Sequence, residues 1–432
     1  MVWFCSIICL SVGIFGFYRD RKIYSPLGFF ATFWALLIFL SGMRLYDLYE
    51  TSTFTYLIVT LGVICFGVGS FFSSLVKIPP SSQNGELNDR IYNILCIICV
   101  IALIYNIQII MRFFASGFDI GAIYYEVART ASGEETSLAG LYPGWQEQLR
   151  QYIGYPLLYT IVPISISAYI STRRKKYLIV SILLSALRFL VDIRRTFLVI
   201  IVVIIACRLL IDSPKIRNFF KNYKLRISKR ALVTTILMLV FGIGFIWLST
   251  IRRAEGEDRY SFIQNFYFYY VGSLPYVSKM FESITISQYT FGLTSFRGLF
   301  APIFGGLAIF GLGNQELMAT ATKNITMLHG SNLFVAPGHR FNSYATIFYQ
   351  FYQDGGIWGV AIISIIFGFY AHYLYKCMNV RFSERDKIKY AYFFSVFIMF
   401  SVLHFNGAVL VYLWPLILER FFYKRKVPLY NQ

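Results

Sequence analysis

The sequence predicts an all-α, polytopic membrane protein with about 11 transmembrane helices, and three observations lead to this fold class. Of the 432 residues, 57% are hydrophobic and only 14% are charged, against about 25% charged residues in an ordinary soluble domain. The apolar residues come in blocks of about 20, the length that crosses about 30 Å of hydrocarbon. Short basic stretches separate the blocks, and the formal net charge is +19. A soluble enzyme, a nucleic-acid-binding domain and a secreted disulfide scaffold are therefore excluded for the chain as a whole.

Apolar runs that are expected to span the membrane follow one another along the chain, about 10 to 12 in all. The first lacks a basic start and a small-residue cleavage site and leads directly into Arg19, so a span is expected there rather than a signal peptide. In chain order, the predicted spans are Val2–Tyr18, Pro26–Met43, Tyr56–Val76, Ile91–Phe113, Ile153–Ile170, Tyr177–Val191, Thr196–Ile211, Ala231–Ser249, Ile357–Tyr375, Ala391–Leu403 and Ala408–Phe421.

Charge gives the expected orientation. With the N-terminus outside and the C-terminus in the cytoplasm, the segments assigned to the cytoplasm carry the whole net charge of +19, as the positive-inside rule requires. Three regions follow: residues 1–249 as an N-terminal bundle of about eight spans with an outer loop at about 115–152, residues 250–356 as a large outer loop, and residues 357–432 as the C-terminal helices. Short helices lying in the membrane interface are expected within the large loop.

The cytoplasmic loops are short, and none contains a G-x-x-x-x-G-K phosphate loop. Any chemistry is therefore expected at the outer face or within the membrane, which argues against ATP-driven transport and against the use of cytoplasmic sugar nucleotides. Cys96 and Cys99 form a CxxC pair, but no second pair and no nearby histidine completes a zinc site. No metal and no cofactor is expected.

Arginines dominate the basic residues at the outer positions, where the exceptions are Lys279 and Lys323. Arg194 and Arg195 lie in a short turn between two predicted spans, and Arg252 and Arg253 directly follow another. A guanidinium grips phosphate oxygens bidentately, so both pairs suit a lipid-linked pyrophosphate. The alternative is snorkelling with local pairing to neighbouring acids.

Arg188 lies inside an apolar run, four residues before Asp192 on the same helical face. This pair is first interpreted as structural.

Two stretches of the large loop are rich in apolar and aromatic residues. Phe291–Gly313 favours an interfacial helix or a re-entrant segment. Tyr260–Tyr276 is typical either of an interfacial aromatic belt or of rings that stack on sugars.

Polar groups of catalytic type gather near the end of the large loop, where His339, Arg340 and Asn342 precede a helix expected to carry Tyr352 to Asp354. The Gly355-Gly356 pair is then expected to turn the chain into the next span. Histidine has a pKa suited to a general base near neutral pH, although a lone loop histidine is more often unremarkable. His329 and the histidines inside predicted spans, His372 and His404, are weaker candidates.

At this point the chain resembles the bacterial oligosaccharide repeat-unit polymerases of the Wzy type, which build O-antigen and capsular polysaccharide. Five stretches carry the resemblance: Ser25–Leu27, Phe66–Ser70, the arginine turn Asp192–Thr196, Asn342–Thr346 and Tyr352–Gly359. The last two look like the family's N-x-Y-x-x … D-x-G-x-x-G pattern. Hydropathy is similar along nearly the whole chain, whereas residue-level similarity is confined to these stretches.

The resemblance implies a GT-C-like, metal-independent membrane glycosyltransferase that joins lipid-linked repeat units at the outer face of the bacterial cytoplasmic membrane. Implied partners are undecaprenyl-pyrophosphate-linked oligosaccharides, membrane lipids, a chain-length regulator and a flippase of the same pathway, with no nucleic acid. Related O-antigen ligases use a histidine followed directly by asparagine. Here His339 precedes Asn342 by three positions, so Asp354 is the alternative base.

The expected site residues fall into three groups. The catalytic candidates are His339, Asp354 and Arg195. The pyrophosphate-binding candidates are Arg194, Arg195, Arg252, Arg253 and Arg340. The substrate-binding candidates are Asn342, Tyr344 and Tyr352.

Three other functions remain open from the sequence. An O-antigen ligase performs the same chemistry on a different acceptor. A lipid-linked oligosaccharide flippase or other secondary transporter would carry charged residues at mid-membrane and internal repeats, and no repeat is found. A metal-dependent GT-C transferase would use an acid of the first outer loop, for which Asp47 and Glu50 are available.

Overall fold

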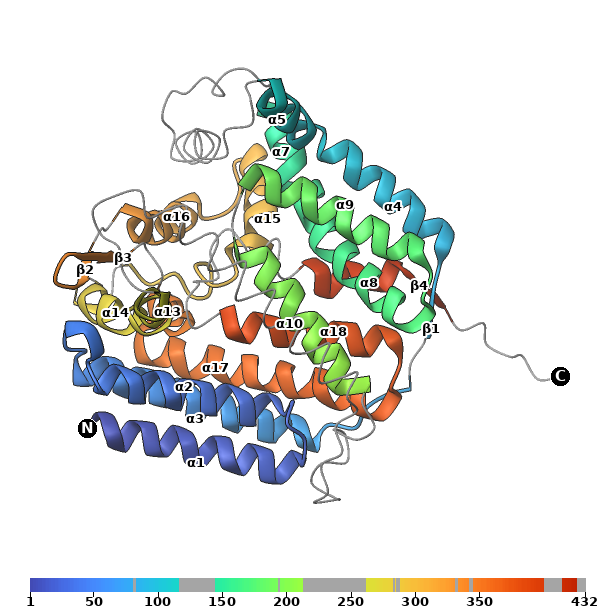
Figure 1. Ribbon diagram of the computed structural model, residues 1–432. Helices are drawn as coiled ribbons and strands as arrows, with labels where there is room; N and C mark the ends of the chain where they lie inside the picture. The colour runs from blue at the N-terminus through green and yellow to red at the C-terminus, as the bar shows by residue number, and fades with distance from the viewer. Residues whose placement is uncertain are drawn as a thin grey trace. The chain divides into compact units, whose positions relative to one another are not determined.

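The computed structural model describes residues 1–80, 83–115, 144–192, 195–212, 262–282, 284, 288–330, 333–341, 345–399 and 414–425. Figure 1 shows the chain, which divides into two compact units, each described here by itself. Unit 1 comprises Met1–Pro79, Leu209–Val380 and Phe393–Val409. Unit 2 comprises Pro80–Arg208, Arg381–Tyr392 and Leu410–Gln432.

Unit 1 is built around a helix bundle. Its helices are α1 (Val2–Asp20), α2 (Pro26–Gly42), α3 (Thr53–Leu75) and α17 (Ile347–Arg381), which lie side by side in Figure 1. Ser25 caps α2 by accepting a hydrogen bond from the Gly28 amide, and Pro26 fills the first helical position. Small residues let the helices approach: a Cβ at Gly69 of α3 would clash with backbone atoms of α17. Close backbone contact at small residues is how helices pack within membranes.

Aromatic rings fill the space between α2, α3 and α17. Phe30 stacks on Phe66 with ring centroids 4.2 Å apart, and Trp34 lies 4.9 Å from Phe348. All four side chains are buried. Each ring removes a large apolar area from its surroundings, so this cluster is the core of unit 1.

The remaining elements of unit 1 gather at one end of this bundle. They are the short turn η1 (Leu45–Asp47), helices α13 (Phe262–Val271), α14 (Ser273–Phe281), α15 (Arg297–Ile309) and α16 (Gln315–Gly330), and the hairpin of β2 (Leu333–Ala336) and β3 (His339–Phe341). The Tyr267 hydroxyl donates to the Leu40 carbonyl at the end of α2. The Tyr49 amide donates to Val335 of β2. We call this end of the bundle the His339 end and the opposite one the Asp20 end.

Unit 2 is also helical. Its elements are β1 (Gln83–Leu87), α4 (Asp89–Ala102), α5 (Ile104–Ala115), α7 (Gly144–Leu149), the π-helix η2 (Arg150–Gly154), α8 (Tyr155–Thr172), α9 (Lys175–Asp192), most of α10 (Arg195–Asp212), the start of α18 (Glu384–Met399), η4 (Glu419–Phe421) and β4 (Tyr423–Arg425). α8 packs on α9 and α4, and β1 pairs antiparallel with β4. Glu419 receives both Arg385 and Lys389 of α18. The β1–β4 pairing ties the C-terminal segment to the first half of the chain, and the Glu419 ion pairs tie it to α18.

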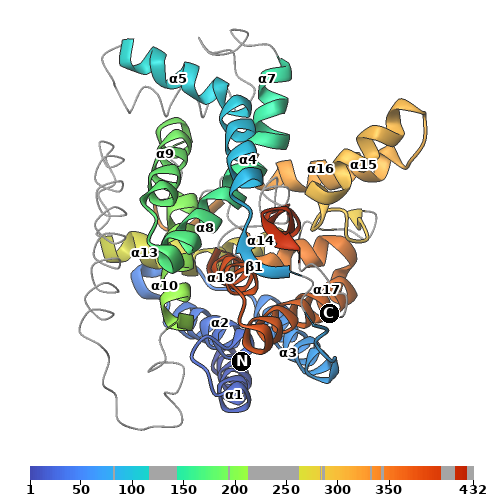
Figure 2. The ribbon, with the colours of Figure 1, turned by 90° about the vertical axis from the view of Figure 1, so that its right-hand side faces the viewer.

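Four helical segments in the described residues are long and apolar enough to cross a membrane: Val2–Asp20, Thr53–Leu75, Arg150–Thr172 and Ile347–Arg381. A fifth results if α4 and α5, which meet at a bend of 51° (Figure 2), form one span. The fold class of a helical protein embedded in a membrane therefore agrees with the structure. The total of about 11 spans stays a prediction, and the predicted span Ala231–Ser249 lies outside the described residues.

Local expectations for the large loop also have structural counterparts. Helix α15 covers part of Phe291–Gly313 and has 13 residues, about 20 Å, which is too short to cross the hydrocarbon core. The helix that carries Tyr352 to Asp354 begins at Ile347 and is interrupted at the glycine pair. Gly356 has φ +61°, and a Cβ there would press on the Tyr289 hydroxyl, so glycine is required by both backbone and space.

Candidate functional site

His339 is held by a flat aromatic contact at the His339 end. Gly338, with φ +71°, turns the β2–β3 hairpin so that His339 begins β3 opposite Ala336. The imidazole then stacks on Phe268 of α13 with centroids 4.1 Å apart and planes 23° from parallel. Phe268 is buried, whereas His339 is half-buried. The ring is therefore oriented by packing and keeps access to solvent.

The loop beside Phe268 is strained. Arg44, Tyr46 and Asp47 all have positive φ, between 49° and 57°, a conformation that costs residues other than glycine about 1 kcal/mol or more each. Tyr46 contacts Tyr267 and Phe268 at 5.6 Å and 6.2 Å between centroids. We call Tyr46, Tyr267, Phe268 and His339 the aromatic cluster. Such strain concentrates at functional sites.

Tyr267 has a fixed protonation state within this cluster. Its hydroxyl donates to the Leu40 carbonyl and accepts from the Leu45 amide. Burial is the main cause that raises the pKa of Tyr267 to about 12. The phenol therefore stays protonated and orders the loop. Nearby, the Lys279 ammonium lies 4.7 Å from the Tyr49 ring and donates to the Phe334 carbonyl, which adds one positive charge to this end.

Asp354 has a different environment from the one a free base needs. The side chain is buried and accepts hydrogen bonds from the Thr290 hydroxyl at 2.7 Å, the Thr294 amide at 2.9 Å and the Ser295 amide at 3.0 Å. These donors order the turn that leads into α15. The geometry favours a positioning role for Asp354 over proton abstraction, because three of its roughly four lone-pair sites already accept hydrogen bonds.

Tyr352 belongs to a second group of rings at the same end. Its ring lies 4.8 Å from Phe281, 5.8 Å from Phe54 and 6.4 Å from Tyr289 between centroids. The side chain is half-buried. These contacts fix the helix start on α3 and α14, so Tyr352 has both a packing role and an accessible edge.

The other predicted site residues are not described in full. Arg194, Arg252, Arg253, Asn342 and Tyr344 lie outside the described residues. Arg195 begins α10 in unit 2 and Arg340 lies in β3 opposite Phe334, and the positions of these two side chains are outside the description as well. Of the candidate residues, the described part of the structure brings His339, Tyr352 and Asp354 to one end of unit 1.

Two arginines of unit 2 converge on one tyrosine, and the sequence analysis missed this pair. The Arg188 guanidinium lies 4.0 Å from the centre of the Tyr155 ring, and that of Arg150 lies 5.3 Å from the same ring. Arg150 also lies 4.7 Å from Tyr105. Arg188 is 8% exposed. A buried arginine in an apolar helix generally marks a functional site, so Arg188 itself was the signal in the sequence. The four-residue spacing of Arg188 to Asp192 favoured a local pair instead.

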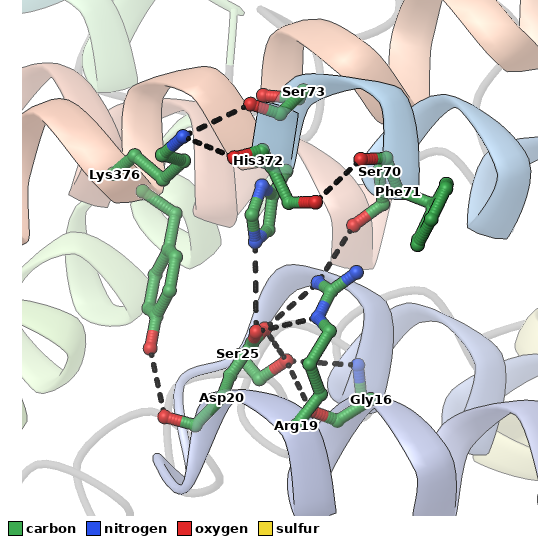
Figure 3. A network of polar contacts seen from close by, with 12 residues as sticks. Gly16, Arg19, Asp20, Ser25, Ser70, Phe71, Ser73, His372 and Lys376 are labelled. Carbon is green, nitrogen blue, oxygen red and sulfur yellow. Dashed lines mark hydrogen bonds and ion pairs between the residues drawn. The ribbon is translucent and has the colours of Figure 1, made fainter. Parts of the chain in front are cut away.

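A buried polar network at the Asp20 end was also missed. The Asp20 carboxylate, whose side chain is 5% exposed, accepts two hydrogen bonds from Arg19, at 2.8 Å and 3.2 Å, and one from Ser25 at 2.6 Å. His372 Nε2 lies 3.5 Å from the same carboxylate. Figure 3 shows this network, in which α1, the cap of α2 and α17 meet around one carboxylate.

The network continues to the end of α3. Arg19 donates to the Ser70 hydroxyl, and the Lys376 ammonium donates to the carbonyls of Ser73, Ser74 and Val76. These carbonyls are the acceptors that a helix leaves without partners at its C-terminus. Lys376 thus caps α3 from α17. The signals in the sequence were an acid directly after the first span and His372 within another.

Among the residues that the structure describes, no group of three or more His, Cys, Asp or Glu side chains could hold a metal ion. Asp47 and Glu50, the acids considered for a metal, are both exposed, and Glu50 pairs with Arg44 at 3.3 Å. No protein-family model, curated protein or solved structure matches the chain. Function is therefore argued from the residues alone.

Proposed function

We propose that the chain is a membrane glycosyltransferase that polymerises polyprenyl-pyrophosphate-linked oligosaccharide repeat units at the outer face of a bacterial cytoplasmic membrane. The observation that carries the proposal is the convergence of Arg150 and Arg188 on Tyr155. Two guanidinium groups beside one ring, one of them buried, present planar donor forks that suit the bidentate grip of a polyanion. A lipid-linked pyrophosphate supplies that anion within the reach of a membrane helix.

The proposed reaction is a displacement at the anomeric carbon of the growing glycan. A sugar hydroxyl of one lipid-linked unit forms the new glycosidic bond, the bond from the anomeric carbon to pyrophosphate breaks, and pyrophosphate leaves on its lipid with the bonding electron pair. Guanidinium groups stabilise the charge that develops on this leaving group. We assign this role to Arg150 and Arg188 together with Arg194 and Arg195.

For unit 1 taken by itself, we propose His339 as the group that accepts the hydroxyl proton. An imidazole with a pKa near neutrality can accept it. Stacking on Phe268 fixes the plane of the ring while His339 stays half-exposed. Tyr46 belongs to the same aromatic cluster and is exposed, so its ring is available to stack on a sugar. Asp354 acts indirectly, by ordering the helix start and the turn that precedes α15.

A second candidate is supported by one specific observation. Asp20, Arg19 and His372 place ionisable groups inside helices long enough to span a membrane, and transporters use such groups to carry protons. A flippase or other secondary transporter for lipid-linked oligosaccharides is therefore kept as the alternative. An O-antigen ligase would perform the same chemistry as the polymerase, and the two differ in the molecule that accepts the glycan.

The test is the surface polysaccharide of a strain from which the gene is deleted. A polymerase deletion leaves single repeats attached to the lipid A core, whereas a ligase deletion leaves none attached. A transporter deletion stops export of the units. If the ladder of polymer lengths is unchanged in the deletion strain, the proposal is wrong.

Variants introduced into the deletion strain test the assigned residues. Arg188→Lys and Arg150→Lys keep the charge but lose the planar fork, and we expect each to reduce polymer by about tenfold or more. Arg173→Lys is the matched control, because Arg173 also faces a tyrosine, Tyr169, at 6.0 Å, but is exposed at the other end of α8. His339→Ala is expected to abolish the ladder in a protein that still inserts. If all four variants made as much polymer as the wild type, the assignments of Arg150, Arg188 and His339 would be wrong.

A further inference from the structure

A cavity of about 400 Å³ lies beside the polar network at the Asp20 end of unit 1. It opens between the ends of α1, α3 and α17. Its lining residues are Arg19, Asp20, Lys22, Ser74, His372, Tyr375, Lys376, Asn379 and Val380. None of these belongs to the site proposed for glycosyl transfer.

Basic residues predominate among the charged side chains that line this cavity. Three cations line it, Arg19, Lys22 and Lys376, against the single carboxylate of Asp20. That carboxylate is engaged by Arg19, with bonds of 2.8 Å and 3.2 Å. The Lys376 ammonium donates to backbone carbonyls at the C-terminal end of α3, which satisfy its protons but do not cancel its full charge. The cavity therefore attracts an anion.

Buried polar atoms at the cavity wall also lack hydrogen bonds. His372 is 4% exposed, and its Nδ1 has no hydrogen-bond partner among the described residues, while Nε2 faces Asp20. Nη1 of Arg19 is also buried and has no hydrogen-bond partner among the described residues. A buried polar atom without a partner costs about 1–3 kcal/mol. A phosphate oxygen would accept from Nη1 of Arg19, whereas His372 Nδ1, whose ring turns Nε2 to Asp20, is itself an acceptor and needs a hydroxyl donor.

The depth of the cavity matches the level of lipid headgroups. Helix α1 has 19 residues, about 28 Å, close to the thickness of the hydrocarbon core. Its last residue, Asp20, therefore lies where the core ends. Beside the cavity, apolar side chains are exposed: Val380, which lines it, is 66% exposed, and Leu75, the neighbour of Ser74, is 68% exposed. Acyl chains are the natural cover for such side chains.

We propose that this cavity binds the phosphate group of an anionic phospholipid, with the acyl chains against Leu75 and Val380. Inorganic phosphate has the same charged group but would leave these apolar side chains uncovered. On the predicted orientation, the cavity faces the cytoplasmic leaflet, where anionic lipids and basic pockets between helices meet. This inference does not depend on the proposed glycosyl transfer.

The experiment is a titration of the purified full chain, followed by native mass spectrometry, with phosphatidylglycerol, phosphatidylcholine or inorganic phosphate. We expect a saturable site for phosphatidylglycerol that neither other ligand fills at the same concentration. Lys22→Gln is expected to weaken this binding about fivefold, the effect of one basic residue near a membrane surface. Lys376→Gln is expected to weaken it at least as much, but it also removes the cap of α3.

Lys77→Gln is the matched control, because Lys77 is exposed two residues after the end of α3 and does not line the cavity. We expect it to change the affinity less than twofold. Equal weakening by Lys22→Gln and Lys77→Gln would mean diffuse surface charge and would overturn the site. Equal binding of phosphatidylcholine would overturn the role of charge, and competition by inorganic phosphate at equal affinity would overturn the lipid.

Discussion

The two ends of the helix bundle in unit 1 each bury a carboxylate, and they do so with opposite partners. At the His339 end, Asp354 receives only neutral donors, a threonine hydroxyl and two backbone amides. At the Asp20 end, the Asp20 carboxylate accepts hydrogen bonds from the charged Arg19 and faces the imidazole of His372. The first arrangement orders a turn, whereas the second joins helices from distant parts of the chain.

This difference indicates how each end is used. Neutral donors fix the backbone around Asp354 and leave the nearby chemistry to the aromatic cluster and His339. The pairing at Asp20 largely neutralises that part of the wall, and Lys22 and Lys376 also line the cavity. A buried charge needs such compensation, because its desolvation costs several kcal/mol.

The largest predicted effect breaks the helix pair that connects the two ends. In Gly69→Ala, the new Cβ would clash with the Ile365 carbonyl and the Phe369 amide, which are backbone atoms and cannot move aside. We expect a loss of about 5 kcal/mol or more, enough to prevent recovery of folded protein. The measurement is the yield of monodisperse protein and its Tm in detergent.

Gly67→Ala is the control in the same helix, because its Cβ would meet only side-chain carbons of Leu27 and Val12 at 3.5 Å and 3.6 Å. Its Tm should stay within a few degrees of that of the wild type. If Gly69→Ala were as stable as Gly67→Ala, the close contact between α3 and α17 would be wrong.

Asp20→Asn tests the charged end. The Arg19 side chain is 18% exposed, and without its carboxylate a mostly buried cation remains. We expect destabilisation of about 3–5 kcal/mol, the typical result of removing one partner from a buried pair. Unfolding in detergent measures it.

The double variant Arg19→Gln/Asp20→Asn should recover part of this loss, since neither charge is then left alone. Strictly additive losses in the two single variants would contradict a direct pair.

Asp354→Asn tests the neutral end and should cost less. One carboxylate oxygen becomes an amide group, which cannot accept from the Ser295 amide, so a buried donor is left without a partner at about 1–3 kcal/mol. A positioning role predicts a lower Tm together with lower activity. Glu316→Gln, at an exposed acid of α16, is the control and should change neither. Lost activity at unchanged Tm would instead support Asp354 as the base.

The features that the sequence predicted well are those that local patterns determine. Helix α1 and the predicted first span, Val2–Tyr18, begin at the same residue and end two residues apart. The interruption at the glycine pair was predicted from composition, because two adjacent glycines disfavour a continuous helix. The predicted span Tyr56–Val76 likewise ends within one residue of α3, whereas α17 extends beyond the predicted span Ile357–Tyr375 at both ends.

Pairings across the chain were beyond such patterns. Asp20 and His372 come together only because α1 and α17 pack against the same helices, and neither residue has a distinctive neighbour in the sequence. Arg150 and Arg188 meet at Tyr155 through the packing of α8 on α9. Helical spacing predicted Asp192 as the partner of Arg188, and this pairing stays a prediction because the Asp192 side chain lies outside the description. Local spacing gives no information on a ring from another helix. The binding assignments at Arg194, Arg252 and Asn342 stay predictions.

The smallest predicted effect concerns a partly exposed carboxylate in unit 2, which provides an intermediate case between Asp20 and Asp354. The Glu384 carboxylate forms ion pairs with Arg208, at 2.6 Å between nitrogen and oxygen, and with Lys387, at 2.9 Å. Its side chain is 32% exposed. Burial raises the pKa of Glu384, but Arg208 and the hydrogen bonds from Ser171 and Lys387 outweigh it and hold the pKa below the usual 4.5.

A carboxylate whose pKa is lower in the folded state stabilises the protein above the pKa of the unfolded state, and this stabilisation is lost as the pH falls through the folded pKa. Solvent screening limits it to about 1 kcal/mol. The difference in unfolding free energy between wild type and Glu384→Gln should therefore be constant from pH 7 to about pH 5.5 and shrink below about pH 4.5. If the difference grew on acidification, burial would dominate over the cations and would raise the pKa of Glu384. The environment of Glu384 would then resemble that of Asp354, whose hydrogen-bond donors are neutral.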